Sequence, residues 1–360
     1  MKTKRSVVLR VLVIWCVLSI FVLCSCTSES EQEYNVPVDA MVLDITVSEV
    51  YGDADAIVTI ISDDGYYATA ENLDRIFGER GLKCTVAGAI KNVKPYTSSW
   101  KELLENDSID LVSHSYNHIR MEDGSDIAQN NRALTHEIVD EDKWFERKFG
   151  HEQIVFVCPE NQMCENGYKI LNENDFWAVR RGHRGFNSLS PDEGIEYGNW
   201  FNLMVQGICD DGVDIDVRNG WVDTAIYDKV WLIEMWHNVM PEDDGGYQTI
   251  LLSDAEEHLD YILYKSNENA IWVATFDETV KYIREKQNVN VSAYIYGDEL
   301  HVYAELTNNE MNIKTFNQPL TVHISIPDEL GIDKVGGFDL VDGELVIDVV
   351  PGVEQVIRIG

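Results

Sequence analysis

The sequence is short of positive charge and lacks the common motifs of nucleotide and structural zinc sites. It holds 28 Lys and Arg against 63 Asp and Glu, for a net charge of −35. A chain of this charge is not expected to bind nucleic acid through its phosphates, and we expect a monomer. No GxGxxG or Walker motif is present, and the seven cysteines form no CxxC pair. These absences argue against a dinucleotide site, a P-loop and a structural zinc site.

The N-terminus carries a short apolar run, "VLVIWCVLSIFVLC" at residues 11–24, preceded by four basic residues and no acid. The run is too short for a confident membrane span, and the pattern is typical of a secretory signal. It ends in "LCSC", which resembles a bacterial lipobox. That resemblance implies lipidation of Cys26 and an exported protein anchored to a bacterial membrane at the cell envelope. An ordinary signal peptide or an uncleaved anchor is the alternative.

Outside the signal, four cysteines have no spacing that assigns a disulfide. Export would permit disulfides, but we expect buried free thiols at these positions, which are Cys84, Cys158, Cys164 and Cys209.

Changes in composition and in the apolar pattern along the chain predict four segments. Residues 1–26 form the signal and residues 27–54 an acidic tether and lead-in. From 55 to 287, apolar runs such as "AIVTII" and "VWLIEMW" alternate with helical patterns such as "ATAENLDRIFGERG". This alternation predicts a parallel α/β sheet with crossovers, either open or closed into a barrel. Residues 288–360 alternate with period two between Gly, Asp and Pro turns, which predicts a small antiparallel, sandwich-like β domain.

Polar residues follow three of the predicted strands. The first strand ends in Ser62-Asp63-Asp64-Gly65, the third in "SHSYNH" with His114 and His118, and a late one in His237. In a parallel α/β architecture the carboxyl ends of the strands gather on one face, where active sites lie. We therefore expect these residues to converge, although each alone has an ordinary structural explanation.

One Asp and two His suit a divalent metal, because imidazole and carboxylate together favour zinc, with cobalt, nickel or manganese as alternatives. Three protein ligands leave positions for water and substrate. A metal there would polarise a carbonyl and acidify water. The remaining Asp and the distant His could then divide the roles of base and acid.

The order "ISDDGY", "SHSYNH", "FVCPEN", "WH" and "IWVATFDETVKYI" resembles the polysaccharide deacetylase family with its NodB-homology domain. The resemblance covers residues 55–287. It implies a distorted (β/α) barrel and a metal-dependent hydrolase that removes N- or O-linked acetyl groups from a carbohydrate.

By this resemblance each candidate residue takes a role. Asp63 is the general base, and the metal ligands are Asp64, His114 and His118. His237 is the general acid.

The segment "FVCPEN" falls where the family usually has Arg-x-Pro-Tyr. After Pro159, the N–H of Glu160 would help to hold the oxyanion. Val157 stands where the family has the arginine that tunes the base, so that arginine is missing. Asp210 and Asp211 are candidates for its acidic partner.

Aromatic and basic residues offer further candidates for substrate contact. Trp200, Trp221 and Trp236 could stack on sugar rings, although Trp236 precedes His237 on a strand and should face the core. The basic segment "RRGHRG" at residues 180–185 could contact an anionic group or form a solvated loop.

The leading hypothesis is a lipid-anchored, metal-dependent carbohydrate deacetylase. A carbohydrate-binding lipoprotein without catalysis, or a metal-dependent amidase on a non-sugar amide, are the alternatives. The missing arginine favours the carbohydrate-binding lipoprotein, and the presence of Asp63 and His237 argues against that alternative.

Overall fold

The computed structural model describes residues 36–150, 152–191 and 199–359. The predicted signal and Cys26 lie outside the described residues, as does the start of the predicted tether, residues 27–35. Among the described residues, no helix combines the length and apolar composition needed to cross a membrane. Residues 39–360 form one compact unit, and the description below concerns this unit.

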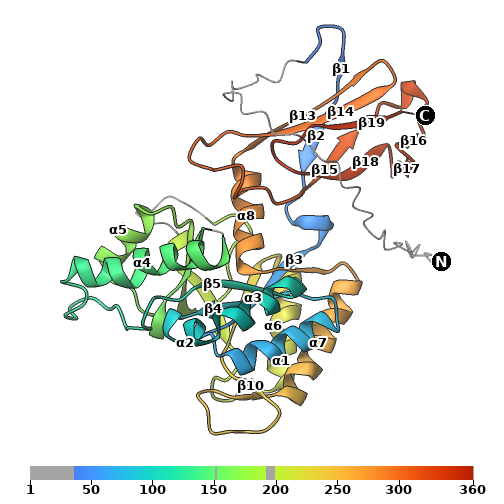
Figure 1. The fold of residues 1–360 in the computed structure, drawn as a ribbon. Helices are drawn as coiled ribbons and strands as arrows, with labels where there is room; N and C mark the ends of the chain where they lie inside the picture. Colours follow the sequence, from blue (N-terminus) through green and yellow to red (C-terminus); the bar gives the residue numbers. More distant parts are fainter. Residues whose placement is uncertain (1–35, 151, 192–198, 360) are drawn as a thin grey trace. The chain divides into compact units, whose positions relative to one another are not determined.

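Seven parallel strands close into a barrel, which confirms the predicted fold class (Figure 1). The barrel closes because the last strand pairs with the first, from Ile57 beside Trp231 to Ser62 beside Trp236. In chain order the strands are β3 (Ala56–Ser62), β4 (Cys84–Gly88), β5 (Ile109–Ser113), β6 (Val155–Val157), β7 (Ala178–Arg184), β8 (Leu203–Gly207) and β9 (Trp231–Trp236). An eighth strand, β12 (Ile271–Val273), runs parallel to the first half of β3.

Helices alternate with the barrel strands. They are α1 (Tyr67–Gly78), α2 (Ile90–Val93), α3 (Thr97–Leu103), α4 (Asn131–Phe149), α5 (Glu165–Asn172), α6 (Ile215–Asp228), α7 (Leu252–Asn267) and α8 (Phe276–Gln287). Two short strands, β10 (Val239–Met240) and β11 (Ile250–Leu251), pair in parallel beyond β9.

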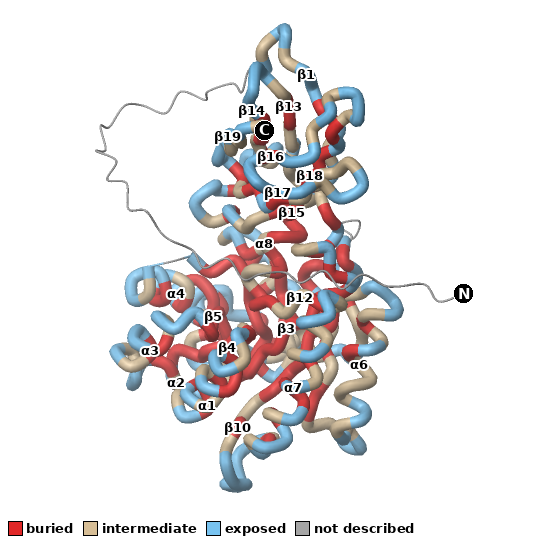
Figure 2. Tube along the Cα trace, turned by 90° about the vertical axis from the view of Figure 1, so that its right-hand side faces the viewer, coloured by how far each residue is buried: buried red, intermediate tan, exposed pale blue. Residues whose placement is uncertain are grey.

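Strands β3, β4, β6 and β9 are buried on both faces, and the red tube in Figure 2 shows this for β3 and β4. Alternate residues join different cores, because side chains on a strand point to opposite sides. Ile57 and Ile61 of β3 pack in one cluster with Ile233 of β9. Val58 and Ile60 pack in a second cluster with α1 and α7. The first cluster therefore lines the inside of the barrel, and its periodicity predicts that Asp63 and His237 also face inward.

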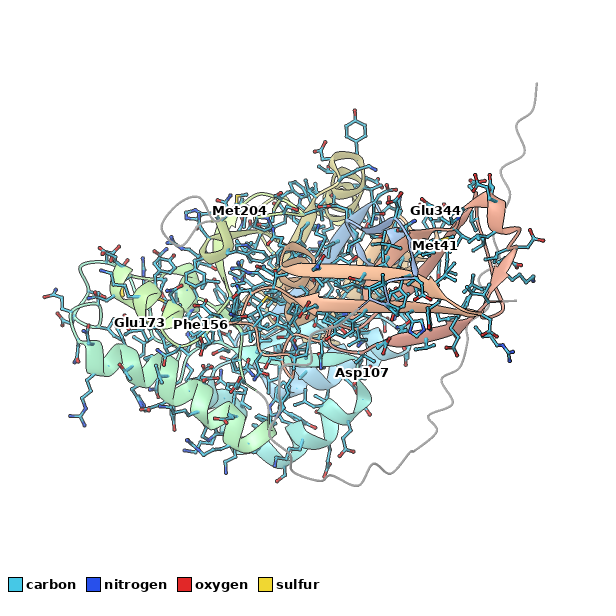
Figure 3. The ribbon with its side chains drawn as sticks, turned by 90° about the horizontal axis from the view of Figure 1, so that it is seen from above. Met41, Asp107, Phe156, Glu173, Met204 and Glu344 are labelled. Carbon is cyan, nitrogen blue, oxygen red and sulfur yellow. The ribbon has the colours of Figure 1, made fainter. Side chains whose placement is uncertain are left out.

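A small β domain follows α8, as predicted. One sheet has the order β1 (Met41–Val42), β13 (Val289–Tyr296), β14 (Glu299–Leu306) and β19 (Gln355–Arg358). A second has the order β18 (Glu344–Val349), β15 (Leu320–Ser325) and β2 (Ile45–Val47), and β16 (Lys334–Val335) pairs with β17 (Phe338–Asp339). Figure 3 labels Met41 and Glu344 on these strands and Phe156 in the barrel.

Two strands of this domain come from the segment expected to be a lead-in. Met41 pairs with Ile295, and Val47 pairs with Val322. The lead-in therefore contributes to the β domain, because its short apolar stretches pair with strands far along the chain.

Candidate metal centre and active site

The end of β3 separates its two acidic residues. All seven residues of β3 are buried, and the chain then turns through left-handed conformations at Asp64 (φ 78°) and Gly65 (φ 74°). A Cβ on Gly65 would lie 2.7 Å from the Gly88 Cα, so only glycine fits this turn. The Asn92 amide holds the turn by donating to the Asp64 carbonyl at 2.8 Å.

Two glutamates of α4 hold the loop that carries the histidines. The buried Glu141 accepts hydrogen bonds from the Ser113 hydroxyl and from the His114 N–H. One turn earlier, Glu137 accepts from the backbone N–H of Asn117 at 2.8 Å and from its side-chain amide at 2.7 Å. The helix thus fixes both ends of the histidine segment.

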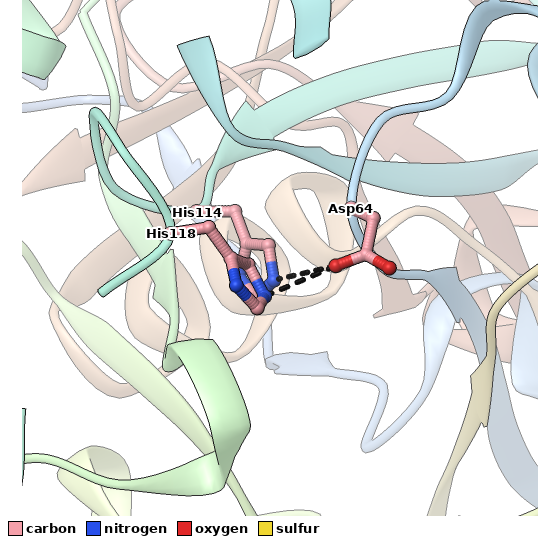
Figure 4. A group of neighbouring side chains, drawn as sticks. All are labelled: Asp64, His114 and His118. Atoms are coloured by element: carbon pink, nitrogen blue, oxygen red, sulfur yellow. Dashed lines mark ion pairs between the residues drawn. The ribbon is translucent and has the colours of Figure 1, made fainter. Parts of the chain in front are cut away.

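Asp64, His114 and His118 come together as predicted (Figure 4). Their ligand atoms lie within 4.8 Å of one another. Asp64 Oδ1 is 3.0 Å from His118 Nε2 and 3.8 Å from His114 Nε2.

The protonation of His114 fits a metal ligand. Its Nδ1 lies 2.8 Å from the Val157 carbonyl, which fixes the proton on Nδ1. Its Nε2 is buried, has no hydrogen-bond partner and is aimed at Asp64. An orphaned imidazole nitrogen beside a carboxylate and a second imidazole is the donor set expected for a divalent metal, so these residues fit the group that the sequence implies.

The charge of Asp64 also suits this role. Burial favours the neutral acid, but the adjacent imidazoles of His114 and His118 outweigh burial and leave the pKa of Asp64 well below its ordinary value. Asp64 is therefore a carboxylate at neutral pH.

Asp63 lies against a buried arginine that the sequence analysis did not assign. Arg180 Nη2 donates to both carboxylate oxygens of Asp63, and the Arg180 side chain is fully buried. Arg180 is the residue directly beside Val157 in the pairing of β6 with β7. The arginine missing at Val157 is therefore supplied from the neighbouring strand, which corrects the expectation that none is present.

The neighbours of Arg180 differ from those expected. Its Nη1 donates to the Asn161 side chain at 3.0 Å. Asn161 packs so closely on β7 that a Cβ on Gly182 would lie 2.2 Å from its side chain. Asp210, a candidate partner for the arginine, instead forms a two-point ion pair with the partly exposed Arg184. The basic segment 180–185 thus divides between the site and the surface.

The segment after β6 is the short helix η4 (Pro159–Asn161), in which both Glu160 (φ 49°) and Asn161 (φ 62°) are left-handed. Proline has no N–H, so the first backbone donor after Cys158 is that of Glu160. Asn161 links this turn to Arg180 and hence to Asp63. The predicted role of Pro159 and Glu160 in holding an oxyanion stays a prediction.

His237 follows β9 beside the end of β3. Ser62 pairs with Trp236, and the Ser62 hydroxyl donates to the His237 carbonyl at 2.8 Å. Burial lowers the pKa of His237 below its ordinary value, although the charges of Asp63 and Asp64 oppose this shift. The imidazole therefore lies within the field of both acids, and the three strand ends converge as predicted.

Two of the three tryptophans considered as sugar platforms are buried and cannot stack on a sugar. Trp200 and Trp236 are fully buried, and Trp221 is half-buried against the helix-side core. The indole N–H of Trp236 donates to the buried Glu234 at 3.0 Å, away from His237. The four cysteines outside the signal are free thiols, as expected, and all but Cys209 are buried.

Residues 52–179 match the family model described as polysaccharide deacetylase. The match covers about a third of the chain, so the similarity to the polysaccharide deacetylase family rests on this segment. The match includes Asp63, Asp64 and both histidines of the metal centre, and it ends one residue before Arg180. No curated protein matches the chain.

Solved structures of deacetylase-like proteins resemble the chain at low identity. A putative polysaccharide deacetylase from Mycobacterium smegmatis is 12% identical, with 68% of this chain and 96% of that chain covered at a TM-score of 0.49. An acetyl xylan esterase from Clostridium thermocellum in complex with cobalt is 15% identical, with 62% and 89% covered at 0.41. A family 4 pseudoenzyme from Bacillus anthracis is 14% identical, with 62% and 65% covered at 0.42.

Proposed function

We propose that this chain is a metal-dependent hydrolase that removes acetyl groups from a carbohydrate and releases acetate. The observation that carries the proposal is the separation of the adjacent acids. Asp64 faces two imidazoles and forms with them a set of donor atoms suited to a metal ion, whereas Asp63 faces Arg180. Two neighbouring carboxylates therefore occupy different electrostatic environments, as two different chemical roles require.

Asp64, His114 and His118 would hold a divalent metal, of which zinc is the first candidate and cobalt, nickel or manganese the others. When bound, the metal supplies Lewis acidity, which polarises a carbonyl and lowers the pKa of water.

The protein groups then perform the proton transfers. Arg180 orients Asp63, so that this carboxylate can accept a proton from the attacking water. The Glu160 N–H would donate to the oxygen that becomes negative. His237 gives a proton to the departing amine or alcohol, and because a depressed pKa makes its imidazolium a stronger acid, the transfer is easier.

Acetate release tests the proposal directly. The purified full chain, loaded with zinc or cobalt, should release acetate from acetylated chito-oligosaccharides, acetylxylan or peptidoglycan fragments. Asp63→Asn should lower turnover by at least about 10²-fold and keep the metal, whereas Asp64→Ala should lower metal occupancy. A metal-loaded chain that releases no acetate from any of these substrates would instead support a carbohydrate-binding protein.

We further propose that the chain is anchored at a bacterial cell envelope through lipid on Cys26. The support is the sequence pattern alone, because this residue lies outside the described part of the chain. Expression in a bacterium with a radiolabelled fatty acid should label the chain, and Cys26→Ser should remove the label. Label that persists in the variant would contradict the assignment.

A further inference from the structure

Tyr247 is a highly exposed aromatic residue in contact with a proposed catalytic residue. Its ring centroid lies 4.9 Å from that of His237, with the planes at 85°. The Tyr247 side chain is nevertheless 65% exposed. Since the rings meet edge to face, the contact with His237 leaves most of the tyrosine ring open to solvent.

The loop that carries Tyr247 is fixed to the end of β9. This loop, residues 241–249, connects β10 to β11, and its residues 241–247 are all exposed (Figure 2). Asn238, which follows His237 directly, donates to the Tyr247 carbonyl at 3.1 Å. The Asn238 carbonyl accepts from the Ile250 N–H at 2.8 Å. Tyr247 is thus held beside His237 by its backbone, not by burial of its ring.

Asn238, which holds this loop, also lies close to α1. A second exposed tyrosine, Tyr66, directly precedes that helix. The Thr69 hydroxyl of α1 lies 3.4 Å from the Asn238 side-chain oxygen. Tyr66, the residue before α1, is 46% exposed and comes two residues after Asp64.

The chemistry of these side chains fits a sugar ring. A tyrosine ring offers a flat apolar face and a polar edge, which suits the C–H face and hydroxyls of a pyranose. The same loop carries Glu242, Asp243 and Asp244, all exposed, and these acids disfavour an anionic glycan. We propose that Tyr247 stacks on a pyranose ring of an uncharged, acetylated glycan and positions its acetyl group at the site, with Tyr66 as a second aromatic contact.

This inference deepens the proposed function and rests on it for the identity of the substrate. Steady-state kinetics of the full-length, zinc-loaded chain on chitohexaose and on 4-nitrophenyl acetate, which has no sugar, would test it. Tyr247→Ala should raise KM for chitohexaose about tenfold, and Tyr247→Phe should keep the wild-type value. Tyr247→Leu, which is apolar but not flat, should behave like the alanine variant. Because 4-nitrophenyl acetate has no sugar, Tyr247→Ala and Tyr247→Leu should lose more activity on chitohexaose than on this ester.

Tyr227 provides the matched control, because it is 88% exposed on α6, and Tyr227→Ala should have no effect. An equal loss of kcat on both substrates in Tyr247→Ala would overturn the proposal, since Tyr247 would then act only through His237. A phenylalanine variant as impaired as alanine, or a leucine variant as good as wild type, would also overturn it.

Binding separates this inference from the proposed function. If the wild-type chain releases no acetate from any substrate, calorimetric titration with chitohexaose and acetylated xylo-oligosaccharides still tests the stacking contact. An affinity that falls about tenfold in Tyr247→Ala, but not in Tyr227→Ala, would support it in a protein that only binds. Absence of binding to both glycans would overturn it.

Discussion

Arg180 holds Asp63 through a single nitrogen, Nη2, while Nη1 is bound to Asn161. The buried guanidinium and the buried carboxylate compensate each other, and removal of one charge leaves the other unpaired in the interior. The base is therefore oriented from β7, and the turn at η4 is tied to the same guanidinium.

Arg180→Gln should lower kcat for acetate release about 10- to 100-fold, because loss of an orienting partner has effects of this size. Metal content should stay unchanged, since Arg180 contacts none of the three metal ligands in the described structure. Measurement of kcat together with metal stoichiometry checks this. Arg184→Gln, in the same segment but paired with Asp210, is the control and should retain activity.

The pairing of Val157 with Arg180 allows a second test of the same contact. In a double variant, Val157→Arg with Arg180→Val, the guanidinium moves one strand along and stays on the same face of the sheet. Partial recovery of kcat relative to Arg180→Gln is expected. If the double variant is as inactive as the single one, the position on β7 is itself essential.

The sequence shows that an arginine is present at position 180, but it does not show that this arginine contacts Asp63. Arg180 lies in the basic segment 180–185, for which the sequence offered contact with an anionic group or a solvated loop. Its contact with Asp63 depends on the register of β6 against β7, which no local pattern specifies. Asp64, His114 and His118 were predictable because they lie in the segments that follow two strand ends of a parallel sheet.

The helices and strands that could be predicted from the sequence are those with a regular pattern of apolar residues. Strand β3 is a continuous apolar run, and α1 buries Leu73, Ile76 and Phe77 at helical spacing. Helix α6 was not predicted, because it buries only Val222 and Ala225, which are too few to form an apolar stripe. Strand β8 was also missed, since it is short and alternates between buried and half-buried residues.

Helix α4 holds the loop that carries His114 and His118. Both oxygens of Glu137 accept from Asn117, which precedes the ligand His118. Glu137→Gln replaces one acceptor with a donor, so one of these hydrogen bonds is lost. The affinity for zinc should fall about tenfold, as for other residues that orient metal ligands, and chelator competition would measure it.

Glu146→Gln is the control on the same helix, since Glu146 is exposed. Its zinc affinity should equal that of the wild type. If Glu137→Gln binds zinc with the wild-type affinity, the histidine loop keeps its geometry without the hydrogen bonds from Asn117 to Glu137.

At the scale of the compact unit, α8 connects the barrel to the β domain. The Tyr282 hydroxyl donates to the Ser48 carbonyl at 2.9 Å, and Glu285 Oε1 accepts from the Gln318 N–H at 3.0 Å. Sequence patterns predicted both domains but not this contact, because Glu285 is a charged residue at a fully buried position. Such positions are found only when the packing is known.

Glu285 should make the stability of the protein depend on pH. Burial raises its pKa from 4.5 to about 8, so the folded chain keeps a proton that the unfolded chain releases. The contribution to the free energy of unfolding is therefore complete below about 4.5 and is lost as pH rises towards about 8, with a slope of up to about 1.4 kcal/mol per pH unit. Urea unfolding at several pH values measures it.

Glu285→Gln should reduce this slope, because glutamine mimics the protonated acid and keeps an oxygen for the Gln318 N–H. Asp110, whose pKa burial also raises to about 8, adds a similar slope in both proteins, so the difference between variant and wild type isolates Glu285. The exposed Glu329 supplies the control, since Glu329→Gln should leave the pH dependence unchanged. The same slope in Glu285→Gln and wild type would mean that Glu285 is ionised in the folded chain and that water reaches the contact between α8 and the β domain.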